Sequence, residues 1–392
     1  MELAGFLSYH GITLDEIVEQ AKATLRLSPD DALFVCGSVV EGLGNEKSDL
    51  DLFLITSRKN IPFTSLNDVL LIIGRCAVDV CVVQHSAVEE LVKKFNDWAS
   101  LPREPRNTIA FTDEERKLLH RLRSGLALYG RERFEQIRDQ IKFIDLARHR
   151  LDTAQHFASN LQVDLAGLRS AGDQYSLLFC AQELLGHTVD ALLAAHKYTN
   201  PHWKWRIRQL SDLPSEWDVE LPGRRTGVSA RDLYLKLHST PRSTSLSDIL
   251  SHALRIVAFS RRVFPWATYR LLSPSLPPLQ AAHSDHTATG VPLPNLDVDV
   301  IVRYRDEKFE LLRLQGEGEI FSLSPKEYSL LCLFDGETPK EYAISEAETL
   351  SNKKVGREFL QQMLALVRHG DFEARSGFDQ QALSTILSSR SN

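Results

Sequence analysis

The sequence lacks several features that would each define a class of protein. Cysteine is scarce: the five cysteines include no Cys-x-x-Cys pair, so we expect reduced core residues rather than a zinc site or a disulfide framework. No run of 18 or more apolar residues is present, and the segment MELAGFLSYHG lacks the basic-then-apolar order of a signal peptide. We therefore expect a cytoplasmic protein without a membrane span.

An excess of positive charge is also absent. The 46 Lys and Arg residues against 52 Asp and Glu residues give a formal net charge of −6. A protein that coats nucleic acid electrostatically usually carries a basic excess, so this balance disfavours extended nucleic-acid binding and a processive polymerase. A local basic patch is still allowed.

The first 109 residues have the pattern of a small unit of helix and short strands. Residues 13–27 show helical periodicity, and Thr13 with Glu16 three residues later has the pattern of a capping box. Apolar runs broken by Gly, Asn and Ser follow, and they predict strands at 32–36, 50–56, 69–73 and 76–83. We expect a small mixed sheet in residues 1–109.

Three further segments follow, and the 392 residues are enough for two or three hydrophobic cores. Residues 110–271 show helical periodicity, which predicts an all-helical bundle. Residues 272–295 are rich in Pro, Ser and Ala without periodicity, which is typical of a linker. Residues 296–392 predict a small α+β domain, with strands at 297–304, 309–314 and 319–323 and helices at 324–334, 339–350 and 355–369. The expected fold class is α+β.

Two aspartates interrupt the apolar strand at 50–56. In the segment SDLDLFLIT, Asp49 and Asp51 are two residues apart, and the alternation of side chains along a strand places both on one face. Two carboxylates at such a short distance repel each other, and each raises the pKa of the other unless a positive group lies between them. The pair therefore predicts a cation site.

A glycine and a serine end the preceding strand. Gly37 lets the backbone approach a ligand closely, and the amides of a short helical turn after it, with the Ser38 hydroxyl, suit phosphate oxygens. Phosphate would then lie beside two carboxylates, and a divalent cation is needed to bridge them. Oxygen-only ligands shared with phosphate favour Mg²⁺.

A third acidic residue lies on a later strand. In CAVDVCVV, Val78 and Val80 share one face, which leaves Asp79 on the other. If this strand lies beside the aspartate strand, Asp79 completes a trio of carboxylates able to hold two metal ions about 3.5–4 Å apart, as in-line phosphoryl displacement requires. The alternative is structural, with Asp49 capping a turn and Asp79 paired with a cation such as Arg75.

The chain resembles the DNA polymerase beta-like nucleotidyltransferase superfamily at Gly37-Ser38, at Ser48-Asp49-Leu50-Asp51-Leu52 and at Asp79. A minimal core followed directly by helices is similar to the small-molecule and protein-modifying branch, which includes aminoglycoside nucleotidyltransferases and MNT-type antitoxins. The motif match covers residues 31–85, and a fainter resemblance continues through the helices.

This resemblance implies a role for each matching residue. Asp49 and Asp51 would ligate the nucleotide-bound Mg²⁺, with Asp51 bridging to a second Mg²⁺. Asp79 would ligate the second ion and take the proton of an acceptor hydroxyl as general base. Gly37 and Ser38 would hold the β- and γ-phosphates of the NTP, and Ser48 belongs to the same nucleotide-binding motif.

A lysine of the helical region is a further candidate ligand of the nucleotide. Related enzymes often bring such a lysine to the triphosphate, and Lys204, in HKYTNPHWKWRIRQL, is the best match because its charge attracts a tetra-anion. The alternative is a solvated basic helix start whose tryptophans, Trp203 and Trp205, lie in the core.

Residues 296–392 weakly resemble PqqD-like or winged-helix modules. Such modules bind peptide leaders or other macromolecules by adding an extended ligand to a sheet edge. The alternative is a helical cap that completes the acceptor pocket.

Taken together, these features predict a Mg²⁺-dependent nucleotidyltransferase. It would move a nucleoside monophosphate from an NTP to a hydroxyl of a small molecule, peptide or protein and release pyrophosphate. Two alternatives remain, a signalling nucleotide synthase and a non-catalytic nucleotide-binding or antitoxin-like module. The acceptor, the preferred base and the oligomeric state stay open.

Overall fold

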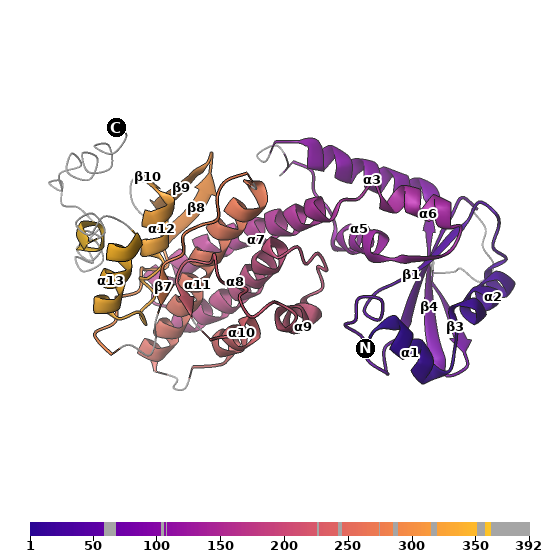
Figure 1. Cartoon of the computed structure of the whole chain (residues 1–392), viewed down its shortest axis with the longest axis horizontal. Coiled ribbons are helices and arrows are strands. Elements are labelled where there is room, and N and C mark those ends of the chain that lie inside the picture. Colours follow the sequence, from indigo (N-terminus) through magenta and orange to yellow (C-terminus); the bar gives the residue numbers. More distant parts are fainter. Residues whose placement is uncertain are drawn as a thin grey trace. The chain divides into compact units, whose positions relative to one another are not determined.

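The computed structural model describes most of the chain, namely residues 1–58, 68–102, 106, 108–225, 227–241, 245–273, 275–284, 289–314, 320–350 and 357–361. The chain forms two compact units (Figure 1). The first comprises Met1–Thr153 and Leu193–Asp212, and the second comprises Ala154–Leu192 and Leu213–Asn392. The expected α+β class, with a small mixed sheet, a helical region and a C-terminal sheet, is confirmed.

A mixed sheet of order β3-β4-β2-β1-β5 forms the centre of the first unit. Its strands are β1 (Ala32–Cys36), β2 (Leu50–Thr56), β3 (Asp68–Ile73), β4 (Cys76–Gln84) and β5 (Leu126–Tyr129). The pair β2 and β4 is parallel, and the other neighbours are antiparallel. The first four strands match the predicted runs within one residue at each end.

Helices cover both faces of this sheet (Figure 1). They are α1 (Leu3–His10), α2 (Leu14–Leu25), α3 (His85–Ser100), α5 (Asp113–Ser124) and α6 (Arg131–Arg138). Alternation sorts the strand residues: Val35 and Leu52 pack with α1 and α2, whereas Phe34 and Phe53 pack with α3, α5 and α6. Helix α2 begins at the predicted capping box, where Thr13 Oγ1 accepts a hydrogen bond from Glu16 N at 3.2 Å.

Strand β5 corrects the prediction that residues 110–271 are entirely helical. The run Leu126–Tyr129 pairs with β1 and closes that side of the sheet. The chain approaches β1 closely at Gly125, where an added Cβ would lie 2.6 Å from the Phe34 ring. A run of four apolar residues is too short to show whether its hydrophobic periodicity is that of a strand or of a helix. The sequence pattern therefore did not distinguish this strand from the helices on either side.

Long helices dominate the remainder of the chain. The long ones are α7 (Phe143–Ala171), α8 (Gln174–Ala195) and α11 (Leu246–Leu272). Between α8 and α11 lie the 3-10 turn η1 (Trp203–Trp205) and two shorter helices, α9 (Arg206–Ser211) and α10 (Ala230–His238). By length and composition α8 could cross a membrane, but 61% of its apolar window is buried inside the protein, as in the core helix of a soluble protein.

The second unit combines α10 and α11 with a small antiparallel sheet of order β10-β9-β8. The remaining elements are β6 (Arg224–Arg225), β7 (His283–Ser284), β8 (Val300–Arg305), β9 (Lys308–Arg313), β10 (Ile320–Leu323), α12 (Pro325–Leu331) and α13 (Lys340–Leu350). Of the helix expected at 355–369, residues 357–361 are described and helical, and the rest lies outside the described residues.

Buried arginines of α11 fasten the C-terminal sheet to the helices. Arg262 pairs with Asp335 at 2.7 Å, and both side chains are almost fully buried. Arg261 donates to the carbonyl of Val300 at 3.0 Å. The segment expected to be a linker also packs here, since Ala282 is fully buried. The expected division into separate domains at 110–271 and 296–392 stays a prediction.

A buried histidine of the first unit suggests a test of acid stability. The His149 ring lies among the rings of Phe95, Trp98 and Phe111, with centroids 6.0, 4.8 and 4.7 Å away. Burial in this apolar site and, as a smaller cause, the charge of Arg116 together lower the pKa of His149 to about 3.

We expect His149→Phe to make the protein more resistant to acid. An unfolded histidine takes up a proton near pH 6.5, whereas His149 stays neutral in the folded protein down to about pH 3, so wild-type stability falls with pH through this window. The loss is at most about 1.4 kcal/mol per pH unit. Urea unfolding between pH 7 and 4 should show a shallower fall for the variant. The exposed His156→Phe is the control, and equal slopes for His149→Phe and wild type would contradict the buried neutral ring.

Candidate active site

Parallel pairing of β2 and β4 brings two of the predicted carboxylates together. Asp51 and Asp79 are Cα partners in the register of these strands, about 4.8 Å apart in such a sheet. Both side chains lie on the sheet face opposite to the one packed with α1 and α2. Asp49 precedes β2 by one residue; it and Asp79 are exposed, and Asp51 is partly buried.

The three acidic groups interact electrostatically. The pKa of Asp51 is raised to about 6, mainly by burial and, to a smaller extent, by the charges of Asp49 and Asp79. The positive charges of Arg121 and Lys204 oppose this effect. The structure thus places the two other predicted carboxylates and two cations within electrostatic reach of Asp51.

The donor set fits Mg²⁺ in chemistry, although the described residues include no ready-made cluster of three acidic, His or Cys ligands. Mg²⁺ is usually held by one or two carboxylates, by substrate phosphates and by water, rather than by an all-protein cage. Carboxylate oxygens that repel one another on one face of the sheet meet this requirement, and a nucleotide would supply further ligands.

Position 37 requires a glycine because the backbone there lies very close to the Asp51 side chain. Its φ is +81°, and an added Cβ would lie 2.0 Å from Oδ2 of Asp51. The next residue, Ser38, accepts hydrogen bonds at its carbonyl from Leu43 N and Gly44 N, both at 2.8 Å. The segment after β1 is a hydrogen-bonded turn in which Glu41 N donates to the carbonyl of Gly37 at 3.2 Å, as in the single helical turn expected, and it keeps Gly37 beside Asp51.

Ser48 shapes the turn that leads into the aspartate segment. Its Oγ accepts from Asn45 N at 3.0 Å, and its own N–H donates to the carbonyl of Asn45 at 3.0 Å. These bonds fix the backbone just before Asp49. The predicted contact of Ser48 with a nucleotide stays a prediction.

Lys204 lies on η1 and is exposed. Its Nζ is 4.9 Å from the centroid of the Trp205 ring, and its charge lowers the pKa of Asp51. Trp203 is 69% exposed, so the alternative in which both tryptophans lie in the core is wrong for this residue. The predicted role of Lys204 at the triphosphate stays a prediction, supported by its position near Asp51.

A polar network that the sequence did not reveal connects these segments. His120 Nε2 lies 3.0 Å from Glu41 Oε2, and its Nδ1 lies 3.0 Å from Thr199 Oγ1. Asn200 Nδ2 donates to both carboxylate oxygens of Glu41 at 3.0 Å. The network ties α5 and the segment before Lys204 to the turn that follows Gly37. Its members are up to 159 positions apart, so no local pattern announces it.

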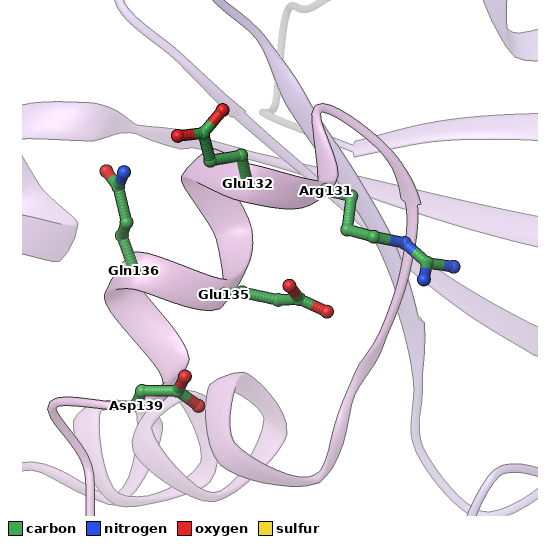
Figure 2. A pocket seen from close by; sticks show the side chains of 5 residues that line it. All are labelled: Arg131, Glu132, Glu135, Gln136 and Asp139. Carbon is green, nitrogen blue, oxygen red and sulfur yellow. The ribbon is translucent and has the colours of Figure 1, made fainter.

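A surface hollow on α6 is separate from this chemistry. It is lined by Arg131, Glu132, Glu135, Gln136 and Asp139 (Figure 2). Four of its five lining residues lie on α6 and the fifth directly follows it, and none is a predicted site residue. We assign it no part in the candidate site.

Comparison with known proteins supports the assignment of this region. Residues 17–96, which hold the three carboxylates and the Gly37–Ser38 turn, match the family model of a nucleotidyltransferase domain. No curated protein matches the chain. Seven chains of solved structures match, and one is a nucleotidyltransferase-like protein from Exiguobacterium sibiricum 255-15 with 13% identity and a TM-score of 0.37, covering 66% of this chain and 79% of that chain. Residues 17–96 are therefore similar to nucleotidyltransferase domains.

Gly37→Ala should destabilise the protein more than Gly11→Ala does. Both glycines have a positive φ, +81° and +64°, so an alanine costs each a similar strain of about 1–2 kcal/mol. A Cβ at position 37 also collides with Asp51, whereas nothing lies within 4 Å of one at position 11. The difference between the two free energies of unfolding therefore isolates the contact with Asp51. Equal losses would contradict the close packing of Gly37 on this carboxylate.

Asp51→Asn should change stability in a pH-dependent way in the metal-free protein. Because the pKa of Asp51 is about 6 when folded and near 3.8 when unfolded, wild-type stability falls as the pH rises through this window. Relative to wild type, the variant should gain up to about 3 kcal/mol between pH 4 and 7. Urea unfolding with a chelator measures this gain, and the exposed Asp97→Asn is the control. A pH-independent difference would mean that the pKa is not raised.

Proposed function

We propose that the protein transfers a nucleoside monophosphate from an NTP to a hydroxyl group and releases pyrophosphate. One observation supports this most directly: Asp51 and Asp79 face the same side of adjacent parallel strands, beside Gly37, within the residues that match the nucleotidyltransferase family model. The acceptor belongs to the same proposal and is a small molecule, a peptide or a protein.

Each site residue has a task in the proposed reaction. Asp49, Asp51 and Asp79 would hold two Mg²⁺ ions, which when bound offset the charge that develops on the attacking and leaving oxygens. Gly37 and Ser38 would receive the β- and γ-phosphates. The exposed Lys204 would offset the charge of the departing pyrophosphate.

The covalent step is an in-line displacement at the α-phosphorus. A bond forms between the acceptor oxygen and the α-phosphorus, and the bond from that phosphorus to the bridging oxygen of the β-phosphate breaks. The electron pair of the broken bond leaves with pyrophosphate. The acceptor proton passes to Asp79, which is exposed and so is reachable from solvent.

The second unit would serve the acceptor. Its antiparallel sheet with α12 and α13 has the element order of the small module suggested by sequence, and a PqqD-like or winged-helix role in binding a peptide or protein acceptor is part of the proposal. The proposed location is cytoplasmic.

Asp49→Asn, Asp51→Asn and Asp79→Asn should each reduce transfer by at least about 100-fold, because each removes a charge that holds a metal ion or takes the proton. The assay follows label from α-labelled ATP, CTP, GTP or UTP with Mg²⁺, with and without cell extract. Asp97→Asn is the matched control and should keep wild-type transfer. Wild-type rates in any of the three variants would refute the assignment of that residue.

The same assay separates the alternatives. Label in a product formed from NTP alone indicates a signalling nucleotide synthase. Tight Mg²⁺-dependent NTP binding without movement of label indicates a non-catalytic nucleotide-binding module.

A further inference from the structure

Helix α5 brings an arginine to the carboxylate site that no motif assigned. Arg121 is partly buried, and its guanidinium lies 5.1 Å from the centroid of the Phe53 ring. Phe53 follows Asp51 by two residues on β2, so the two side chains share one face of the strand. The guanidinium is therefore stacked on the residue next to the central carboxylate.

Electrostatic coupling places the same charge close to the site. After burial, Arg121 is the strongest influence on the pKa of Asp51, and it lowers that pKa. It also lowers the pKa of Cys36, the Cα partner of Asp51 on β1, and of His202, two residues before Lys204. The charge of Arg121, stacked on Phe53, is thus felt both at the aspartate strand and at the segment that carries Lys204.

Among the residues that the structure describes, none accepts a hydrogen bond from the Arg121 guanidinium. Other arginines of this unit have carboxylate partners, such as Arg58 with Asp31 at 2.6 Å. Within the described residues, the Phe53 ring is the short-range partner of the Arg121 guanidinium. A guanidinium offers five N–H donors in a planar fork that matches phosphate oxygens, so this group is available to a ligand.

The part of α5 that carries Arg121 is anchored by the neighbouring residue, His120. His120 is buried and held between Glu41 and Thr199, each at 3.0 Å. Because Glu41 also accepts from Asn200, the same contacts hold the segment that leads to Lys204. A preorganised arginine loses less conformational entropy when it binds an anion than a mobile one does.

We infer that Arg121 binds a phosphate group of the nucleotide next to Asp51, as a second cation beside Lys204. The inference rests on the proposed function, since it names a further ligand of the same NTP. The competing role is that of a counter-ion for Asp51, which would be displaced when a nucleotide with its metal arrives.

The test is the affinity of the full chain for ATP, CTP, GTP and UTP with Mg²⁺, measured by isothermal titration calorimetry. Arg121→Gln should weaken binding of the preferred NTP by about 10- to 100-fold, because a charge-assisted pair of hydrogen bonds is lost. Arg121→Lys should recover part of this loss, because it keeps the charge without the fork. Circular dichroism and thermal melting without nucleotide check that both variants fold.

Arg123→Gln is the matched control. Arg123 lies on the same helix, is partly buried and stacks 4.4 Å from the Phe143 ring, but it neighbours Asp139 rather than the carboxylate site. The Arg123→Gln variant should bind the NTP as tightly as the wild-type protein does.

The outcomes separate this inference from the proposed function. If Asp51→Asn abolishes Mg²⁺-dependent NTP binding while Arg121→Gln binds as tightly as wild type or more tightly, Arg121 is a counter-ion only and the inference fails alone. If wild type binds none of the four nucleotides, the proposed function fails and the inference with it. A loss shared equally by Arg123→Gln would show a general effect of charge on α5 and would also overturn it.

Discussion

The candidate site depends on two like charges that the parallel pairing of β2 and β4 holds opposite each other. That pairing is fixed from the other side of the sheet, where Leu52, Val78 and Val80 are fully buried against α1 and α2. A slip of one residue would turn these side chains toward the charged face and the aspartates into the core, so hydrophobic burial sets the register of the charges. The repulsion is moderated because Asp79 is exposed to water.

Positive charge reaches this site from segments far along the chain. Arg121 comes from α5 and Lys204 from η1, and the contacts among Glu41, His120 and Asn200 hold both segments to the turn after β1. Polar groups buried in such a network are costly unless each is paired, so the network favours one arrangement of these segments. The first unit thus gathers acidic and basic side chains around Asp51.

The sequence predicted the sheet of the first unit well because its strands are strongly apolar and bounded by Gly, Asn and Ser. Strand β5 was missed because a run of four residues between helices has no readable period. The buried pair of Arg262 and Asp335 also escaped prediction: the two residues are 73 positions apart, and neither residue type signals burial by itself.

By itself, the sequence determined the local chemistry, because neighbouring residues on a strand or turn have fixed relative directions. The spacing of Asp49 and Asp51 and the glycine at position 37 are of this kind. The tertiary structure alone decided that Asp79 faces Asp51 and that Arg121 stacks beside it. Contacts between distant segments depend on which apolar faces of helices and strands pack together. The order of residues along the chain does not specify which faces these are.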